Sequence, residues 1–144
     1  MPTAHRETQV DRRLLLAAVA ALPFAGCESI KRKDKSVRLN DALRAYTEAV
    51  RWSNFDTASL FTVPREGMPR RVDPATLAGL KVTGFAVRIN YVNEAADEAD
   101  VAIDFSYYHE DRGTIRTVEQ HDTWYWSESR GGWVLDGSLP DFRR

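Results

Sequence analysis

Residues 101–126 show the most regular alternation of apolar and polar positions in the chain. Apolar side chains occupy every second position of the first half, and Val118, Trp124 and Trp126 share one parity in the second half. Alternation with a period of two is typical of β-strands that bury one face. Asp111-Arg112-Gly113 separates the two halves with the residue types of a tight turn. The pattern therefore predicts a long antiparallel hairpin.

Helical periodicity comes earlier in the chain. Apolar positions in residues 37–51 recur at spacings of three and four, which predicts an amphipathic helix. A second helix is expected over residues 54–61, with Ser53 as its cap and Asp56 three residues on. Asp73-Pro74 predicts the start of a short helical turn, which Gly79 would end.

Two further strands are expected, at residues 81–92 and 133–136. The first would place Phe85, Val87, Ile89 and Tyr91 on one face. Helices that precede a run of antiparallel strands predict an α+β fold, with the helices on one face of the sheet.

The composition is that of one folded domain. The chain has 144 residues, of which 43% are hydrophobic and 28% charged, so it can form a packed core. Its net charge of −1 gives no general attraction to nucleic acid, and we expect no nucleic-acid partner. Its one cysteine, Cys27, excludes an intramolecular disulfide.

The N-terminal sequence predicts an export signal over residues 1–26. Arg12 and Arg13 precede a short apolar run, and Ala25 and Gly26 precede Cys27. Phe24-Ala25-Gly26-Cys27 resembles the lipobox of bacterial lipoproteins. The resemblance implies that the Cys27 thiol takes a diacylglyceryl group, that the chain is cut before Cys27, and that the new amine is acylated, for example with palmitate. Phe24 stands where that family usually has Leu.

The membrane destination follows from the same resemblance. Glu28 and Ser29 follow the cysteine, and the absence of Asp there resembles the pattern of lipoproteins that reach the outer membrane facing the periplasm. The paired arginines leave two export routes open, and we favour the general secretory route over the twin-arginine route. Residues 27–36 would form a basic tether. This tether would be either a solvated spacer or a segment attracted to anionic lipid headgroups.

The closing sequence carries a second resemblance, which covers residues 37–142. Residues 123–126, Thr-Trp-Tyr-Trp, followed by residues 132–137 and the tail Leu139-Pro140-Asp141-Phe142 resemble the last strands of NTF2-like (cystatin-like) bacterial lipoproteins of uncharacterised function. The resemblance implies a curved antiparallel sheet wrapped around an N-terminal long helix, in a domain of residues 37–144. A clear strand between the second and third helices, which many members have, is missing from the pattern.

A two-residue turn at Arg112-Gly113 would place Tyr107 opposite Val118 and Phe105 opposite Gln120. Gln120 and Asp122 would then face the helix, where a poorly solvated Asp122 carboxylate would have a raised pKa and could serve as a general base. The weak catalytic candidates are Asp122, Tyr107 and Gln120. The residues predicted to line a ligand pocket are Tyr46, Phe105, Tyr107, Gln120, Asp122 and Trp124. We favour the interpretation in which Asp122 is a hydrogen-bonded rim residue and Trp124, Trp126 and Trp133 are packing residues.

The opposite, convex face would pair Asp104 with His121 and Ser106 with Glu119. Such pairs are common on solvated sheet faces, and this face is also a candidate homodimer contact. His109, beside the turn, is expected to be exposed. The histidine spacing fits no metal-ligand motif, and we expect neither a metal nor a cofactor.

These observations favour a membrane-anchored, non-enzymatic binding module for a small apolar ligand or an envelope protein. The alternative is a small pocket enzyme of the isomerase or lyase type, with Asp122 as its base.

Overall fold

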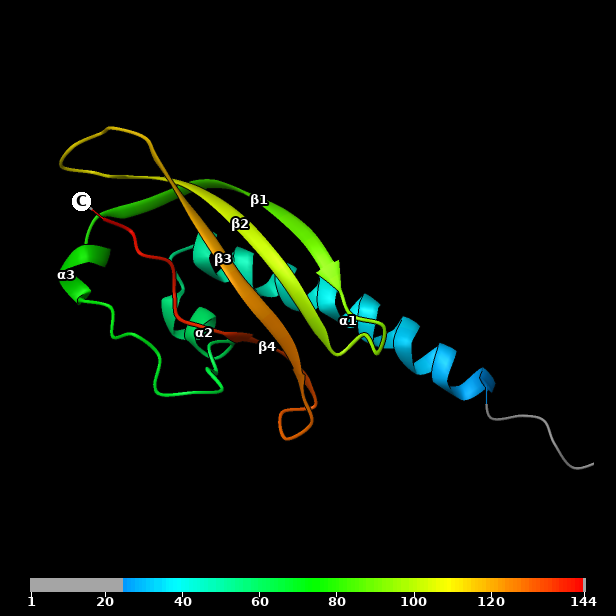
Figure 1. Ribbon diagram of the computed structural model, residues 1–144. Helices are drawn as coiled ribbons and strands as arrows, with labels where there is room; N and C mark the ends of the chain where they lie inside the picture. The colour runs from blue at the N-terminus through cyan, green and yellow to red at the C-terminus, as the bar shows by residue number, and fades with distance from the viewer. Residues whose placement is uncertain (1–24, 144) are drawn as a thin grey trace, which may run out of the picture.

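The computed structural model describes residues 25–143, which form one long helix, two short helices and a four-stranded sheet (Figure 1). The predicted export segment lies outside the described residues except for its last two positions. The helices are α1 (Ala25–Arg51), α2 (Phe55–Ser59) and α3 (Pro74–Leu77). The strands are β1 (Leu80–Val92), β2 (Glu98–His109), β3 (Arg116–Ser127) and β4 (Gly132–Asp136). The α+β prediction is confirmed.

Helix α1 begins at Ala25, twelve residues before the predicted start at residue 37. Lys, Arg and Glu are strong helix formers, and no glycine or proline interrupts the chain between Cys27 and Arg51. The predicted tether at residues 27–36 is therefore helical, and its first part projects beyond the sheet (Figure 1). None of the described helices combines the length and the apolar character needed to cross a membrane.

The end of α1 differs from the predicted cap. The Ser53 backbone has φ of 57° and its N–H donates to the Val50 carbonyl, while the Asn54 N–H donates to the Ala49 carbonyl. This pair of bonds is a Schellman motif, in which Ser53 occupies the left-handed position usually held by glycine. Asn54, rather than Ser53, then caps α2 by accepting a bond of 3.2 Å from the Thr57 N–H. The predicted cap of α3 by Asp73 is confirmed.

The sheet is antiparallel in the order β1-β2-β3-β4. The predicted hairpin is present, but its register differs by two residues from the prediction, because residues 110–115 form a longer loop than a two-residue turn. Phe105 lies opposite Val118, and Ile103 lies opposite Gln120. A shift of two residues preserves the faces, so Gln120 and Asp122 still point to the helix side.

Strand β1 also departs from simple alternation. Irregularities between Val82 and Gly84 and between Ile89 and Tyr91 interrupt its pairing with β2. Phe85, Val87 and Ile89 share the helix-facing side as predicted, but Tyr91 pairs with Asp100 and lies on the other side. A bulge adds one residue to one strand, so the positions after it change face.

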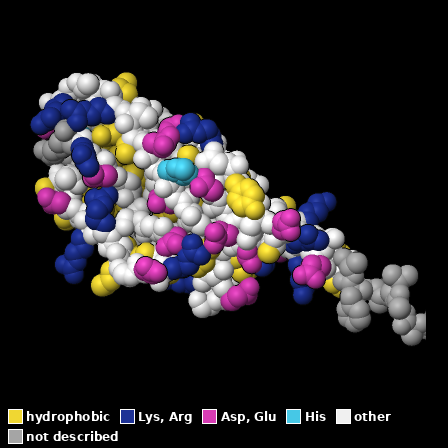
Figure 2. Space-filling view, in the orientation of Figure 1, with side chains coloured by type: hydrophobic (Ala, Val, Ile, Leu, Met, Phe, Trp, Pro, Cys, Tyr) yellow, Lys and Arg dark blue, Asp and Glu magenta, His cyan; other side chains and the backbone are white. Residues whose placement is uncertain are grey.

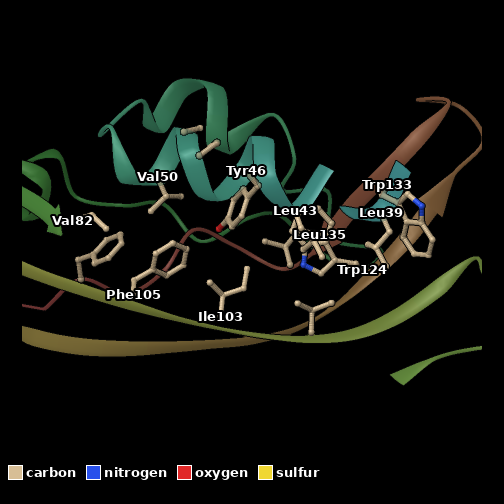
Figure 3. Close-up of a cluster of buried hydrophobic side chains, with 14 of the residues drawn as sticks. Leu39, Leu43, Tyr46, Val50, Val82, Ile103, Phe105, Trp124, Trp133 and Leu135 are labelled. Carbon is tan, nitrogen blue, oxygen red and sulfur yellow. The ribbon is translucent and has the colours of Figure 1, made fainter. Parts of the chain in front are cut away.

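The core lies between α1 and the helix-facing side of the sheet (Figure 3). Leu39, Leu43, Tyr46 and Val50 line one stripe of α1 at spacings of four and three. The sheet contributes buried side chains from every strand; the largest of those under 2% exposed are Trp124, Phe105, Ile103 and Leu135. Trp124 and Trp133 are 1% and 3% exposed, which confirms their predicted packing role.

The convex face carries charged side chains that pair with one another. The Arg88 guanidinium contacts Asp104 and Glu119 at 2.7 Å each, and His121 contacts Asp100 at 2.8 Å. The predicted opposition of Asp104 to His121 is therefore wrong by the same two-residue shift: His121 lies opposite Ala102, Asp104 opposite Glu119, and Ser106 opposite Thr117. Figure 2 shows acidic and basic side chains interspersed over this face.

Candidate functional site

The structure brings together the side chains predicted to form a pocket. The Tyr46 hydroxyl, on α1, donates a hydrogen bond of 2.8 Å to Oε1 of Gln120 on β3. Trp124 packs edge-on against Tyr46 with ring centroids 5.4 Å apart. Phe61 completes this cluster, with ring centroids 6.0 Å from Tyr46. Tyr46 is fully buried, and its burial raises the pKa of the hydroxyl. These rings fill the space between helix and sheet.

The C-terminal segment, residues 137–143, covers the remainder of that space. Phe142 is 3% exposed, and its ring lies 5.1 Å from Tyr107 and 6.1 Å from Phe105, between centroids. Two predicted site residues hold the segment: Gln120 Nε2 donates to the Ser138 carbonyl at 2.7 Å, and the Tyr107 hydroxyl donates to the Arg143 carbonyl at 3.0 Å. Gln120 and Tyr107 thus act as packing and tail-binding residues in this structure.

Asp122 lies half-buried below the start of the same segment. Burial raises the pKa of its carboxyl group, while the Gln120 amide and His121 oppose the rise. A Cβ atom added at Gly137 would stand 2.9 Å from Asp122 Oδ1, so a larger residue there would require the carboxylate to shift. Asp122 therefore has the shifted pKa expected of a general base, but the tail lies directly over it.

His109 is the predicted residue whose environment differs most. It is 3% exposed rather than exposed, and its Nε2 lies 2.9 Å from the Thr76 carbonyl of α3. The short helix folds back over the end of β2 and covers the ring. The described residues contain no group of three or more His, Cys, Asp or Glu side chains arranged to hold a metal.

A concave feature lies beside the filled cluster. A cavity of about 490 Å³ opens between α2, the loop of residues 62–72, α3 and the C-terminal segment. Its apolar wall includes Phe55, Val72, Leu77 and Leu139. Most of the remaining lining residues are polar, and small-ligand sites are usually cavities of a few hundred Å³ that combine apolar surface with a few polar groups.

The polar groups of this cavity differ in their pairing. The Arg70 guanidinium bonds the Leu139 carbonyl at 3.0 Å and contacts Asp141 at 3.4 Å. Ser59 and Thr62 donate their hydroxyls to backbone carbonyls of the α2 region. The Asp56 carboxylate is exposed and has no hydrogen-bond or ion-pair partner among the described residues. Asp56 is therefore the cavity's free charged group.

A second cleft of about 400 Å³ lies on the other side of Ser53. It is lined by the residues at and just after the end of α1, including Trp52, by the start of β1, including Lys81, and by Tyr108 of β2. The Arg51 guanidinium lies 5.7 Å from the Trp52 ring centroid and donates a bond of 2.6 Å to the Val82 carbonyl. Lys81 pairs with Glu110 at 3.3 Å. The cationic groups of this cleft are thus already engaged.

Cys27 lies at the opposite end of the molecule from the cavity beside α2 and from the second cleft. It is exposed in the first turn of α1, and Lys31, Arg32 and Lys33 follow it on the projecting part of the helix. Lys35 and Arg38, further along, lie over the Trp126 ring at 5.2 and 4.8 Å from its centroid. These contacts attach the helix to the sheet at the point where it leaves the domain.

Comparisons of the chain with protein-family models, with curated proteins and with solved structures each returned no match.

Sequence reasoning did not find the cavity beside α2. Its walls come from segments without periodicity, namely the loop that holds Pro64 and Pro69 and the tail that holds Leu139. The available signal was the apolar tail itself: Leu139 and Phe142 follow the last strand at positions where an exposed end needs no apolar residue.

Proposed function

We propose that this protein is a lipid-anchored binding module of NTF2-like fold, held through Cys27 at the outer membrane on its periplasmic side. The observation that carries the proposal is the opposite placement of anchor and cavity along α1. Cys27 lies at one end of α1, and Ser53, which follows its other end, lines the cavity. A helix of this length separates them by about 40 Å, so a lipid on Cys27 leaves the cavity accessible.

The NTF2-like assignment is supported by the order and packing of the elements. A long helix lies across the concave side of an antiparallel sheet, with a short helix after it and the aromatic strands last. The chain between α2 and α3 approaches β4 at a single parallel bridge, Thr62 to Leu135. That bridge stands where many members of the fold have a full strand.

Binding is favoured over catalysis because of what covers Asp122. The Tyr46 hydroxyl is already bonded to Gln120, and the tail binds both Gln120 and Tyr107. A substrate would have to displace the tail before it reached the carboxylate. The cavity beside α2 requires no such displacement.

The lining of the cavity favours a small amphipathic cation, such as an amine with an apolar body. Phe55, Leu77 and Leu139 offer apolar surface, and Asp56 offers the unpaired charge. Arg70 lies across the cavity but is held by Asp141. An organic anion would meet Asp56 without a free cation to compensate.

Membrane attachment is tested by fractionating cells that express the full chain or its Cys27→Ser variant. The proposal expects the natural chain in the outer-membrane fraction and the variant outside it. Recovery of both chains in the same soluble fraction would contradict the anchor.

Ligand binding is tested with 4-phenylbutylamine and, as the probe of opposite charge, 4-phenylbutyrate. Calorimetric titration of the detergent-solubilised full chain should detect the amine only. Asp56→Asn should abolish the signal, whereas Glu94→Gln, an exposed carboxylate outside the cavity, should retain it. Equal binding of both probes would contradict the proposed site. So would an Asp56→Asn variant that binds the amine as the natural chain does.

A further inference from the structure

The two edges of the sheet are treated differently by the rest of the chain. Strand β4, of five residues, is covered: the Val63 N–H donates to the Leu135 carbonyl, and the Leu135 N–H donates to the Phe61 carbonyl, both at 2.8 Å. Strand β1, of thirteen residues, forms the other edge. Figure 1 shows β1 outermost along the top of the sheet. A long uncovered edge presents a row of backbone groups that another strand can pair with.

Among the described residues, only the first part of β1 has backbone carbonyls that accept bonds from outside the sheet. Arg51 donates to the Val82 carbonyl at 2.6 Å, and the Ser53 hydroxyl lies 3.5 Å from the Leu80 carbonyl. Across residues 84–89, no described group outside β2 bonds to the backbone of the strand. The two irregularities in pairing stand on either side of this segment and leave it regularly extended.

The rows of apolar side chains that run from strand to strand on the helix-facing side also end at β1. Val87 and Ile89 lie opposite Ile103 and Val101 of β2, each of which is 1% exposed. Val87 and Ile89 are themselves 37% and 40% exposed, on the helix-facing side. A further strand beside β1 would continue these rows and cover the two side chains.

The sequence of the segment is complementary to itself in one register. An antiparallel pair of β1 strands centred on Val87 places Phe85 opposite Ile89 of the second copy and Val87 opposite Val87. On the other side, Arg88 faces Ala86. Centring on Arg88 instead would oppose two guanidinium groups, which is unfavourable. Centring on Ala86 would leave Ile89 opposite the irregular end of the strand.

We propose that a second copy of this chain pairs its β1 with this edge, antiparallel and centred on Val87, so that two four-stranded sheets form one continuous sheet. The convex face is less suited to this contact because Arg88, Asp104 and Glu119 already neutralise one another there. The interface does not involve the residues that line the cavity beside α2. It does not depend on lipidation or on the ligand site.

Disulfide trapping tests the register directly. Residues paired directly across antiparallel strands have Cα atoms about 4.5–5.5 Å apart, within the range of a disulfide. Val87→Cys in the full chain should therefore form a covalent dimer under mild oxidation. Ile89→Cys should not, because Ile89 of the second copy lies four residues along the strand from Ile89 of the first copy, about 13 Å away. Ile115→Cys, exposed in the loop before β3, and the natural chain serve as further controls.

Sedimentation analysis of the detergent-solubilised full chain provides the second readout. The natural chain should sediment as a dimer, and Val87→Lys should weaken the dimer by about tenfold or more because like charges face each other on the two-fold axis. Thr117→Arg, on the convex face, should leave it unchanged. A monomeric natural chain, a dimer sensitive to Thr117→Arg but not to Val87→Lys, or trapping no greater for Val87→Cys than for Ile89→Cys would each overturn the proposal.

Discussion

The Tyr46 hydroxyl donates a hydrogen bond of 2.8 Å to Gln120 in the centre of the core. It joins the long helix to the sheet, and Gln120 in turn holds the C-terminal tail through the Ser138 carbonyl. Tyr46→Phe leaves the Gln120 oxygen buried without a donor. We expect the free energy of unfolding to fall by about 1–3 kcal/mol, measured by urea denaturation.

Tyr91→Phe is the matched control for this change. Tyr91 is 61% exposed and has no hydrogen-bond partner among the described residues. Its effect on unfolding should stay within about 0.5 kcal/mol. Equal effects of the two substitutions would show that the core bond contributes nothing.

Phe142 makes the C-terminal tail part of the core. Its ring packs against Phe55, Phe105 and Tyr107. Phe142→Ala should lower the free energy of unfolding by about 3–5 kcal/mol because it leaves a large void. Arg143→Ala removes a mostly exposed side chain while keeping the carbonyl that Tyr107 binds, and should cost less than about 1 kcal/mol. A tail that is merely draped on the surface would make the two variants indistinguishable.

Ser53 adopts a left-handed backbone conformation at the end of α1, with φ of 57°. Glycine has no Cβ and adopts this conformation without strain. Ser53→Gly should therefore raise the free energy of unfolding by about 0.5–1 kcal/mol, measured by thermal or urea unfolding. Ser36→Gly, inside the same helix, should have the opposite sign and cost about 0.5 kcal/mol. A destabilised Ser53→Gly chain would refute this account of the helix end.

Asp122 makes the free energy of unfolding depend on pH in a direction that can be stated. Burial raises the pKa of its carboxyl group above the ordinary value, so the folded chain binds this proton more tightly than the unfolded chain does. The contribution is favourable at low pH and is lost as pH rises through the raised pKa. Asp122→Asn should thus gain stability relative to the natural chain between pH 4 and pH 7, measured by urea unfolding at both pH values.

Asp136 provides a control of opposite sign. Partial burial acts to raise the pKa of its carboxyl group, but hydrogen bonds from Arg65 lower it overall. Its contribution is present above the ordinary pKa and lost as pH falls below it, so Asp136→Asn should lose stability relative to the natural chain as pH rises from about 2 to about 5. The same direction in both variants would contradict the assigned environments.

Much of the arrangement around Tyr46 could be predicted from the sequence. The face of the sheet on which a strand residue lies depends on whether its position in the alternation is odd or even. Gln120, Asp122 and Trp124 share a parity with the buried positions of β3, and a register shift of two residues does not alter this. The individual partners across the hairpin could not be predicted, since they depend on the length of the loop at residues 110–115.

Other features depend on contacts between segments that have no periodicity. The tail of residues 137–143 is held by Gln120, Tyr107 and Arg70, each far away in the sequence. His109 is buried by α3, which comes some thirty residues earlier in the chain. The cavity beside α2 arises from the same tertiary contacts. No local pattern encodes these positions.

The most direct test of the central claim is the mass of the full-length gene product recovered from membranes, with tandem spectrometry of its N-terminal peptide. We expect a mature chain that begins at Cys27 and carries a diacylglyceryl group and a further acyl chain. An unprocessed chain, or a mature chain with a free Cys27 thiol, would contradict it.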